Sequence, residues 1–171
     1  MEFIIQKAEL HQAPAIALVI REAYLALEHK EWYVADDTSY IENLLGQNKG
    51  LGYVARETDS GSIAGIFLAA FPGTDPKNLG YDLGFSKEKL SLAAHMDSAA
   101  VLPQYRGHHL QYRLMQEAEK ELRKMGYRYL LCTVHPDNHF SKNTILRQGY
   151  QIIATKEKYG GHLRDILLKE L

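Results

Sequence analysis

The fold is decided by the stretch Val101–Met115, VLPQYRGHHLQYRLM, in which an apolar strand end leads through a turn into an amphipathic helix. The first N–H groups of such a helix have no intrahelical partner and lie at the positive end of the helix dipole, so the turn is suited to a pyrophosphate. Gly107 lets a phosphate approach the backbone, because no Cβ fills the space, and Arg106 adds a cation. The competing interpretation of these residues alone is that Gly107 only permits the turn.

Hydrophobic periodicity along the whole chain predicts both helices and strands. Apolar residues at helical spacing, with capping residues and stop glycines, predict helices over His11–Glu28, from Thr38 or Ser39 to Leu45, over Gly107–Met125, and from Asn138 or Ser141 to Gly149. Short apolar runs predict strands over Phe3–Ala8, Gly52–Glu57, Ser62–Phe71, Leu90–Leu102, Tyr127–Val134, Tyr150–Lys158 and Leu163–Leu171. The expected order is β α α β β β α β α β β, in a single domain over residues 1–171.

Composition excludes several classes of protein. The 171 residues suffice for one hydrophobic core. The net charge of −1 does not indicate a nucleic-acid or anionic-membrane partner. The one cysteine, Cys132, rules out an internal disulfide and is expected to be an inert core residue. We expect no metal site, because Pro136 breaks the helix that would align His135 with His139. No apolar run is long enough for a signal peptide or a membrane span, so we expect a cytoplasmic protein.

Two blocks of the sequence resemble one known family. Val101-x-Pro-Gln-Tyr-Arg-Gly107 at a strand-to-helix turn is similar to the acyl-CoA pyrophosphate loop of the GNAT superfamily of N-acetyltransferases, whose pattern is Gln/Arg-x-x-Gly-x-Gly/Ala. Asn138-x-x-Ser141, followed by Arg147-Gln-Gly-Tyr150, resembles the second block of that family. The resemblance implies a GNAT fold of the α/β (α+β) class, with a mixed, mostly antiparallel central sheet and a β-α-β crossover that carries the acyl-CoA site.

The resemblance also implies a cofactor and the residues that hold it. Acetyl-CoA or a related acyl-CoA would place its pyrophosphate on the backbone of the 104–109 loop and its pantetheine between the strands that end near Val101 and Val134. Asn138 would contact the pantetheine or the substrate side of the cleft. The residues expected at the cofactor are Val101, Gln104, Tyr105, Arg106, Gly107, His108, His109, Asn138 and Ser141.

The sequence departs from the family pattern at two positions. His109 stands where the loop usually ends in Gly or Ala, so its side chain must turn away from the ligand. Ile145 stands where many members have a tyrosine that protonates the leaving thiolate, and isoleucine has no proton to donate. Tyr159, in a glycine-flanked hairpin with Arg164 nearby, is the best remaining candidate for the acid. Unassisted departure of the thiolate is the alternative.

The reaction needs a base, because an alkyl amine with a pKa near ~10 is protonated at neutral pH and cannot attack a thioester. His95 and Asp97 alternate along the predicted strand onto the face of Val101, provided that no bulge intervenes. Many family members carry a glutamate at the position of His95, and the serotonin N-acetyltransferases have histidine on this strand. We predict that His95 is the principal base, and Asp97 is the competitor.

The acceptor side carries further expectations. Trp32, Tyr33 and Tyr40 surround the second helix, which lines the acceptor pocket in this family. The long segment Pro72–Lys89 leads into the predicted active strand, so we expect it to form one wall of the pocket, where Asp82 would attract a cationic amine.

The sequence therefore predicts an N-acetyltransferase that moves an acetyl group from acetyl-CoA to a primary amine by direct attack in a ternary complex. The acceptor is a small molecule or a peptide or protein amine, and its identity stays open, as do the length of the acyl donor and the formation of a homodimer. A non-catalytic acyl-CoA-binding module or sensor is the alternative, and a partner-binding domain without CoA is a third.

Overall fold

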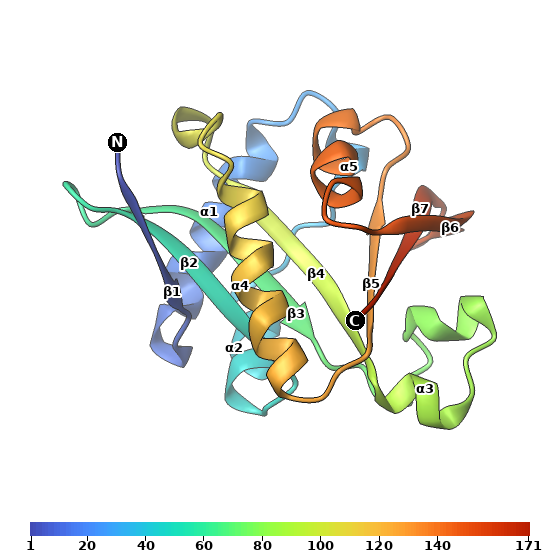
Figure 1. The fold of residues 1–171 in the computed structure, drawn as a ribbon. Coiled ribbons are helices and arrows are strands. Elements are labelled where there is room, and N and C mark those ends of the chain that lie inside the picture. Colours follow the sequence, from blue (N-terminus) through green and yellow to red (C-terminus); the bar gives the residue numbers. More distant parts are fainter.

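The computed structural model of the chain describes residues 1–171 and contains one seven-stranded sheet in the order β1-β2-β3-β4-β5-β7-β6 (Figure 1). β4 and β5 are the one parallel pair, and all other neighbours are antiparallel. The strands are β1 Phe3–Lys7, β2 Gly50–Glu57, β3 Ile63–Ala70, β4 Ala93–Val101, β5 Tyr129–Val134, β6 Gln151–Lys158 and β7 His162–Glu170.

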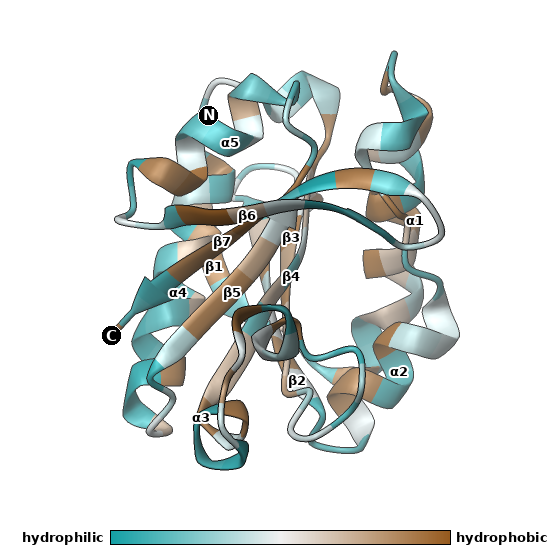
Figure 2. Ribbon diagram, turned by 90° about the vertical axis from the view of Figure 1, so that its right-hand side faces the viewer, coloured by the Kyte–Doolittle hydropathy of each residue, from teal (hydrophilic) through white to brown (hydrophobic).

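Helices cover both faces of this sheet. Figure 2 shows α4 and α5 on one side of the strands and α1 and α2 on the other. Packing of α1 against β3 and β4, and of α4 against β2, β3 and β4, buries the apolar residues between the layers. The helices are α1 Ala13–Leu25, α2 Thr38–Gly46, α3 Lys87–Ser91, α4 Leu110–Lys124 and α5 His139–Leu146. No helix combines the length and apolar composition that a membrane crossing requires.

The helix α4 illustrates how the pattern of the sequence specifies the layers. Its buried residues recur at helical spacing and include Leu110, Leu114, Ala118 and Leu122. That apolar stripe packs on the sheet, while the opposite face is charged. Gly126 ends the helix with φ 91°, a left-handed conformation that favours glycine. The helix is therefore amphipathic, ends at a glycine and packs on the sheet with its apolar face.

The feature that shapes the site is the separation of β4 from β5. The two strands are paired only at residues 93–95 with 129–131, and beyond His95 and Leu131 they diverge. The pairing of β4 with β3 shifts register between Leu68–Ser98 and Ala69–Met96, so Asp97 is an extra residue on β4. Such a β-bulge re-aims side chains and increases the local twist. The edge of β4 that faces β5 is therefore left without a strand partner from Met96 to Val101.

The expected fold class and crossover unit are confirmed, with differences at the ends of elements. Residues 90–91 belong to α3 and not to a strand, so β4 begins at Ala93, three residues later than predicted. The helix predicted from Gly107 begins at Leu110, because Gly107 and His109 have left-handed backbones. The segment predicted as an irregular loop contains a 3-10 turn at Leu79–Leu83 as well as the start of α3.

The packing of α4 predicts a stability effect. Leu114 is fully buried in the core. Leu114→Ala removes apolar contacts and leaves a cavity, so it is expected to lower the free energy of unfolding by about 2–5 kcal/mol, measured by urea denaturation. Leu18→Ala on α1 is the matched control, since Leu18 is 58% exposed and its loss is expected to change the free energy of unfolding by less than about 0.5 kcal/mol. Equal effects of the two substitutions would contradict the assigned core.

Candidate active site

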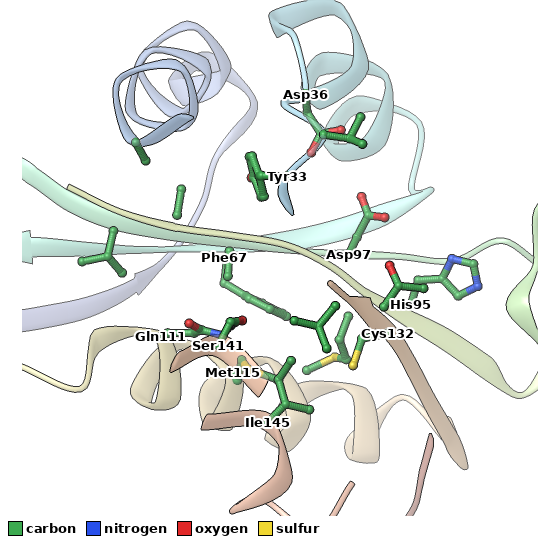
Figure 3. Close-up of a pocket in the computed structure, with 18 of the residues that line it drawn as sticks. Tyr33, Asp36, Phe67, His95, Asp97, Gln111, Met115, Cys132, Ser141 and Ile145 are labelled. Atoms are coloured by element: carbon green, nitrogen blue, oxygen red, sulfur yellow. Dashed lines mark hydrogen bonds between the residues drawn. The ribbon is translucent and has the colours of Figure 1, made fainter. Parts of the chain in front are cut away.

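A cavity of about 1410 Å³ lies where β4 and β5 diverge and reaches both faces of the sheet. Figure 3 shows Tyr33, Asp36 and Asp97 on one side of the sheet, and Gln111, Ser141, Met115 and Ile145 on the other. We call the first side the acceptor end, lined by Tyr33, Asp36, Tyr40, Asp97 and Tyr159. We call the second side the cofactor end, lined by Arg106, Gly107, His109, Gln111, Asn138 and Ser141.

The cofactor end offers a run of free hydrogen-bond donors. The consecutive backbone N–H groups of residues 107–112 donate to no other group of the protein. They combine the left-handed turn before α4 with the open N-terminus of the helix, and Arg106 lies beside them at the cavity wall. Such a run of aligned donors at the positive end of a helix dipole binds phosphate groups. The donors lie further along the chain than predicted, because the N–H groups of Tyr105 and Arg106 are bonded to Leu102 and Pro103.

Gly107 provides the close approach that a phosphate needs. Its φ is +84°, and a Cβ built there would meet no atom within 4 Å. The space above the backbone is therefore open to a ligand. His109 adopts φ 56°, which is uncommon for a residue with a side chain.

Most of the other predicted cofactor residues also line the cavity. Val101, Tyr105, Asn138 and Ser141 are at its wall, although the hydroxyl of Tyr105 is directed to Glu57. Asn138 caps α5 by accepting a hydrogen bond from the backbone of Ser141 at 3.3 Å. Ser141 in turn accepts one from the side chain of Gln111 at 3.0 Å, which joins α5 to α4 across the cofactor end.

Two predicted cofactor residues lie outside the cavity. Gln104 is exposed on the 3-10 turn at Pro103–Tyr105 and does not line the wall. His108 packs its ring against Phe3, with 5.0 Å between the ring centroids, so it points toward β1. The prediction concerned the backbone of this loop, and the N–H of His108 is among the free donors of residues 107–112, whereas the two side chains are directed elsewhere.

Between the two ends the wall is apolar. Phe67, Met115, Cys132, Val134 and Ile145 line this part of the cavity, and all of them are buried. Burial raises the pKa of the Cys132 thiol, so this group stays protonated at neutral pH. Ile145 occupies the wall without a polar atom, as the sequence indicated. A thioester with its acyl group would find few competing polar groups here.

The acceptor end is built on the bulge of β4 and the segment that precedes α2. The hydroxyl of Tyr40 donates to the carboxylate of Asp97 at 2.6 Å. The hydroxyls of Tyr33 and Ser98 are hydrogen-bonded to each other. Asp97 and its neighbour Ser98 therefore both face the α1–α2 side, which the extra residue makes possible.

This arrangement corrects the expected faces of β4. The prediction placed His95 and Asp97 on the face of Val101 unless a bulge intervened, and the bulge at Asp97 does intervene. Val101 packs toward Gly65 and Leu114, on the α4 side of the sheet.

Asp36 is a residue of the acceptor end that sequence reasoning missed. It lies one position before Asp37, whose carboxylate caps α2 by accepting from the backbone of Tyr40 at 2.8 Å. Burial, and next the charge of Asp97, raise the pKa of Asp36 to about 7. Burial likewise raises the pKa of Asp97, against the hydrogen bond from Tyr40. The Asp36-Asp37 pair before a helix was the one available signal, and it suggested only a cap.

The side chain of His95 is not free to accept a proton from an amine. Its Nε2 accepts a hydrogen bond from the backbone N–H of Leu79 at 3.0 Å, so the lone pair of the neutral ring is engaged. Burial, aided by the charge of Lys158, lowers the pKa of His95 to about 4. Its ring lies at the cavity wall but points away from Asp36 and Tyr33 (Figure 3). The structure thus gives His95 a role in holding the turn at Leu79–Leu83.

The predicted acid and aromatic residues lie around the acceptor end. The hydroxyls of Tyr159 and Thr133 are hydrogen-bonded at 2.9 Å, which brings Tyr159 from the hairpin to the strand β5. Burial raises the pKa of Tyr159, so its proton is retained. Arg164 lies over the Tyr159 ring and donates to the Glu31 carbonyl at 2.8 Å. Trp32 lines the cavity and stacks between His29 and His135.

The segment Pro72–Lys89 contributes only its first part to the cavity. Pro72, Asp75 and Lys77 line the wall, which agrees with the expected position of the segment. Asp82 does not line it, because its carboxylate is paired with Lys156 and Lys158 of β6 at 3.3 and 2.8 Å. Its charge is therefore neutralised within the protein and is not available at the cavity. No group of three or more His, Cys, Asp or Glu side chains could hold a metal ion.

The fold and the site together define a transferase that holds an anionic, extended thioester cofactor. The chain provides free N–H donors for a pyrophosphate, an unpaired strand edge for amides and an apolar wall for an acyl group. The chain belongs to the acetyltransferase (GNAT) family, whose model matches residues 14–150. It is an acetyltransferase that depends on acetyl-CoA as its co-substrate.

Solved structures show the same fold at low sequence identity. A GNAT-family acetyltransferase from Streptococcus pneumoniae is 19% identical, with a TM-score of 0.72, and the alignment covers 99% of each chain. The ribosomal-protein-alanine N-acetyltransferase from Brucella melitensis is 19% identical, with a TM-score of 0.73 and coverage of 98% of this chain and 99% of that one. The yncA protein of Salmonella typhimurium, solved with acetyl-CoA, is 17% identical, with a TM-score of 0.72 and coverage of 99% and 94%. Among curated proteins, none matches the chain.

The open space above Gly107 predicts a specific loss of cofactor binding. Gly107→Val places a side chain where the phosphate would lie, and we expect the Kd of CoA in calorimetry to rise at least about tenfold. Gly61→Val is the matched control, because Gly61 has φ +69° and equally open surroundings in the hairpin between β2 and β3. It brings comparable backbone strain far from the cavity and is expected to leave the Kd unchanged. Equal affinities of the two variants would overturn the phosphate assignment.

Proposed function

We propose that the protein transfers the acetyl group of acetyl-CoA to a primary amine by direct attack in a ternary complex. The observation that carries this proposal is the acidic acceptor end, where Asp36 and Asp97 line the same cavity as the free N–H donors of residues 107–112. Carboxylates attract an amine in its ammonium form, whereas they would repel an anionic acceptor. The relative from Brucella melitensis is named for an amine acceptor, the alanine of a ribosomal protein, which is consistent with this class of reaction.

The residues at one end of the cavity bind the cofactor, and those at the other end bind the amine. The donors of residues 107–112 hold the phosphates, and the unpaired edge of β4 from Met96 to Val101 offers backbone groups to the pantetheine amides. Bound acetyl-CoA supplies the activated acyl group. At the acceptor end, Asp97 supplies the negative charge that holds the ammonium, and Tyr40 keeps that carboxylate in place. The amine must lose a proton before its lone pair can attack the thioester.

Tyr159 is the proposed acid for the leaving thiolate. Its hydroxyl reaches Thr133 on β5, and its raised pKa keeps the proton available at neutral pH. Ile145, on the opposite wall, cannot serve. Tyr159 thus takes over the role that the family often gives to a tyrosine on α5.

A panel of amines tests the proposed reaction. Release of the CoA thiol is measured for the wild-type protein with alkyl amines, polyamines, aminoglycosides, lysine derivatives and peptides with free N-termini. We expect turnover of at least one cationic alkyl amine, because the acceptor end is acidic and aromatic. Binding of acetyl-CoA without turnover of any amine would instead support an acyl-CoA sensor.

The hydrogen bond that the Nε2 lone pair of His95 accepts from Leu79 leads to a second prediction. His95→Ala is expected to change kcat by less than about threefold, far below the ~10²–10⁴ that removal of a positioned base costs. The variant loses the bond to Leu79, so it is expected to lower the melting temperature while the Kd of acetyl-CoA stays the same. A loss of kcat on the order of 10² that recovers at high pH would instead establish His95 as the base.

A further inference from the structure

Asp36 lies one residue before the cap of α2 and lines the same cavity as Asp97. Asp37 caps this helix, and the Tyr40 side chain extends from its first turn to Asp97. Asp36 directly precedes this capped position in the chain. Figure 3 shows its carboxylate on the same side of the sheet as that of Asp97, over the cavity.

Neither carboxylate has a cationic partner within the protein. The ion pairs of the chain are all formed by other residues. Arg164, the arginine that lines the acceptor side, directs its guanidinium to the carbonyls of Glu31 and Leu163. Two carboxylates that share a partly desolvated site cannot both ionise easily, so one of them retains a proton or the site takes up a cation.

The groups around Asp36 decide which of the two ionises first. Burial raises its pKa most, the charges of Asp97 from β4 and Asp37 from the same segment add to the rise, and the Ser98 hydroxyl lowers it. Tyr33 and Tyr40 also face this site, but burial raises the pKa of each phenol, so both stay neutral. Asp97 accepts the Tyr40 hydrogen bond, which favours its ionised form. Burial raises the pKa of Asp97 as well, but the charge of Asp97 adds to the rise at Asp36, so we assign the negative charge to Asp97 and the exchanging proton to Asp36.

We propose that Asp36 is a catalytic residue of this site, whose carboxylate takes the proton of the incoming alkylammonium while Asp97 stays ionised. This proposal rests on the proposed acetyl transfer. The N–H bond of the ammonium breaks, an O–H bond forms on Asp36, and the freed lone pair attacks the thioester carbonyl. A second N–H proton is lost as the amide forms and balances the proton taken up by the thiolate. Asp36 then returns its proton to water in the open cavity.

This role specifies the class of acceptor. An alkyl amine arrives as a cation and needs Asp36, whereas a weakly basic amine such as 2,2,2-trifluoroethylamine is largely neutral at pH 7 and does not. The loss of kcat/KM in Asp36→Asn is therefore expected to be on the order of 10² or more for alkyl amines and less than about threefold for the fluorinated amine. A structural role of Asp36 would reduce both rates alike.

The pH dependence of kcat/KM provides the sharper measurement. A base must be deprotonated to act, so in the wild-type protein the rate with an alkyl amine is expected to rise as pH increases through about 7, the pKa of Asp36. Asp36→Asn is expected to lose this step, and its rate then follows the fraction of neutral amine up to pH ~10. The Kd of acetyl-CoA is measured alongside and is expected to stay unchanged.

The variant Asp97→Asn distinguishes Asp36 as the base beside a charged Asp97 from Asp97 as the base itself. Without the Asp97 charge, the pKa of Asp36 falls, so the step in the profile is expected to move below pH 7 and the KM of the amine to rise. If Asp97 were itself the base, the step would vanish in this variant. Asp37→Asn is the matched control, since it removes a neighbouring carboxylate, retains a good helix cap and is expected to shift the step only slightly.

The outcomes distinguish this proposal from the one on which it rests. Turnover by the wild-type protein together with an unchanged kcat and pH profile in Asp36→Asn would overturn the role of Asp36 and leave acetyl transfer intact. A vanished step in Asp97→Asn would assign the proton to Asp97 instead. Absence of turnover by the wild-type protein on the whole panel, with acetyl-CoA still bound, would overturn both proposals.

Discussion

The separation of β4 from β5 beyond His95 and Leu131 is the constraint on which the site depends. If the two parallel strands stayed paired, their backbone N–H and C=O groups would be hydrogen-bonded to each other, and no gap would lie between them. The extra residue at Asp97 adds twist to β4 and leaves its edge free from Met96 to Val101. The same bulge turns Asp97 toward the α1–α2 side. One local irregularity thus opens the cavity and supplies the charge of its acceptor end.

The two ends of the cavity have opposite electrostatic character. The cofactor end presents free N–H groups, the N-terminus of α4 and Arg106, all of which favour anions. The acceptor end presents two carboxylates without cationic partners, which favour cations. The apolar wall between them contains Phe67 and Met115 and keeps the opposite charges from neutralising each other. A phosphorylated thioester and an ammonium would therefore enter from opposite sides and meet where the wall carries the fewest polar groups.

The sequence predicted the features that depend on local pattern. The helical period of α4, the glycine of the phosphate turn and the crossover into β5 each follow from residues close in the chain. Features that depend on distant contacts were not predictable. The bulge at Asp97 arises from pairing with β3, and the lone pair of His95 is engaged by Leu79, sixteen residues earlier. Asp36 lies in an irregular segment whose sequence shows only a helix cap. Its raised pKa comes from burial and next from the charge of Asp97, and both depend on the fold.

The walls of the acceptor end are fixed before any amine binds. His95, which lines the cavity, holds the turn at Leu79, and Asp82 ties this turn, outside the cavity wall, to Lys156 and Lys158 of β6. Arg164 of β7 holds the carbonyl of Glu31, and Trp32 stacks on His135. The contacts of Arg164 and Trp32 join the segment before α2 to the β5–β7 half of the sheet. Because these contacts hold the segment that leads to Asp36, and Tyr40 holds Asp97, little ordering remains when the amine arrives, and more of its binding energy can position the nitrogen for attack.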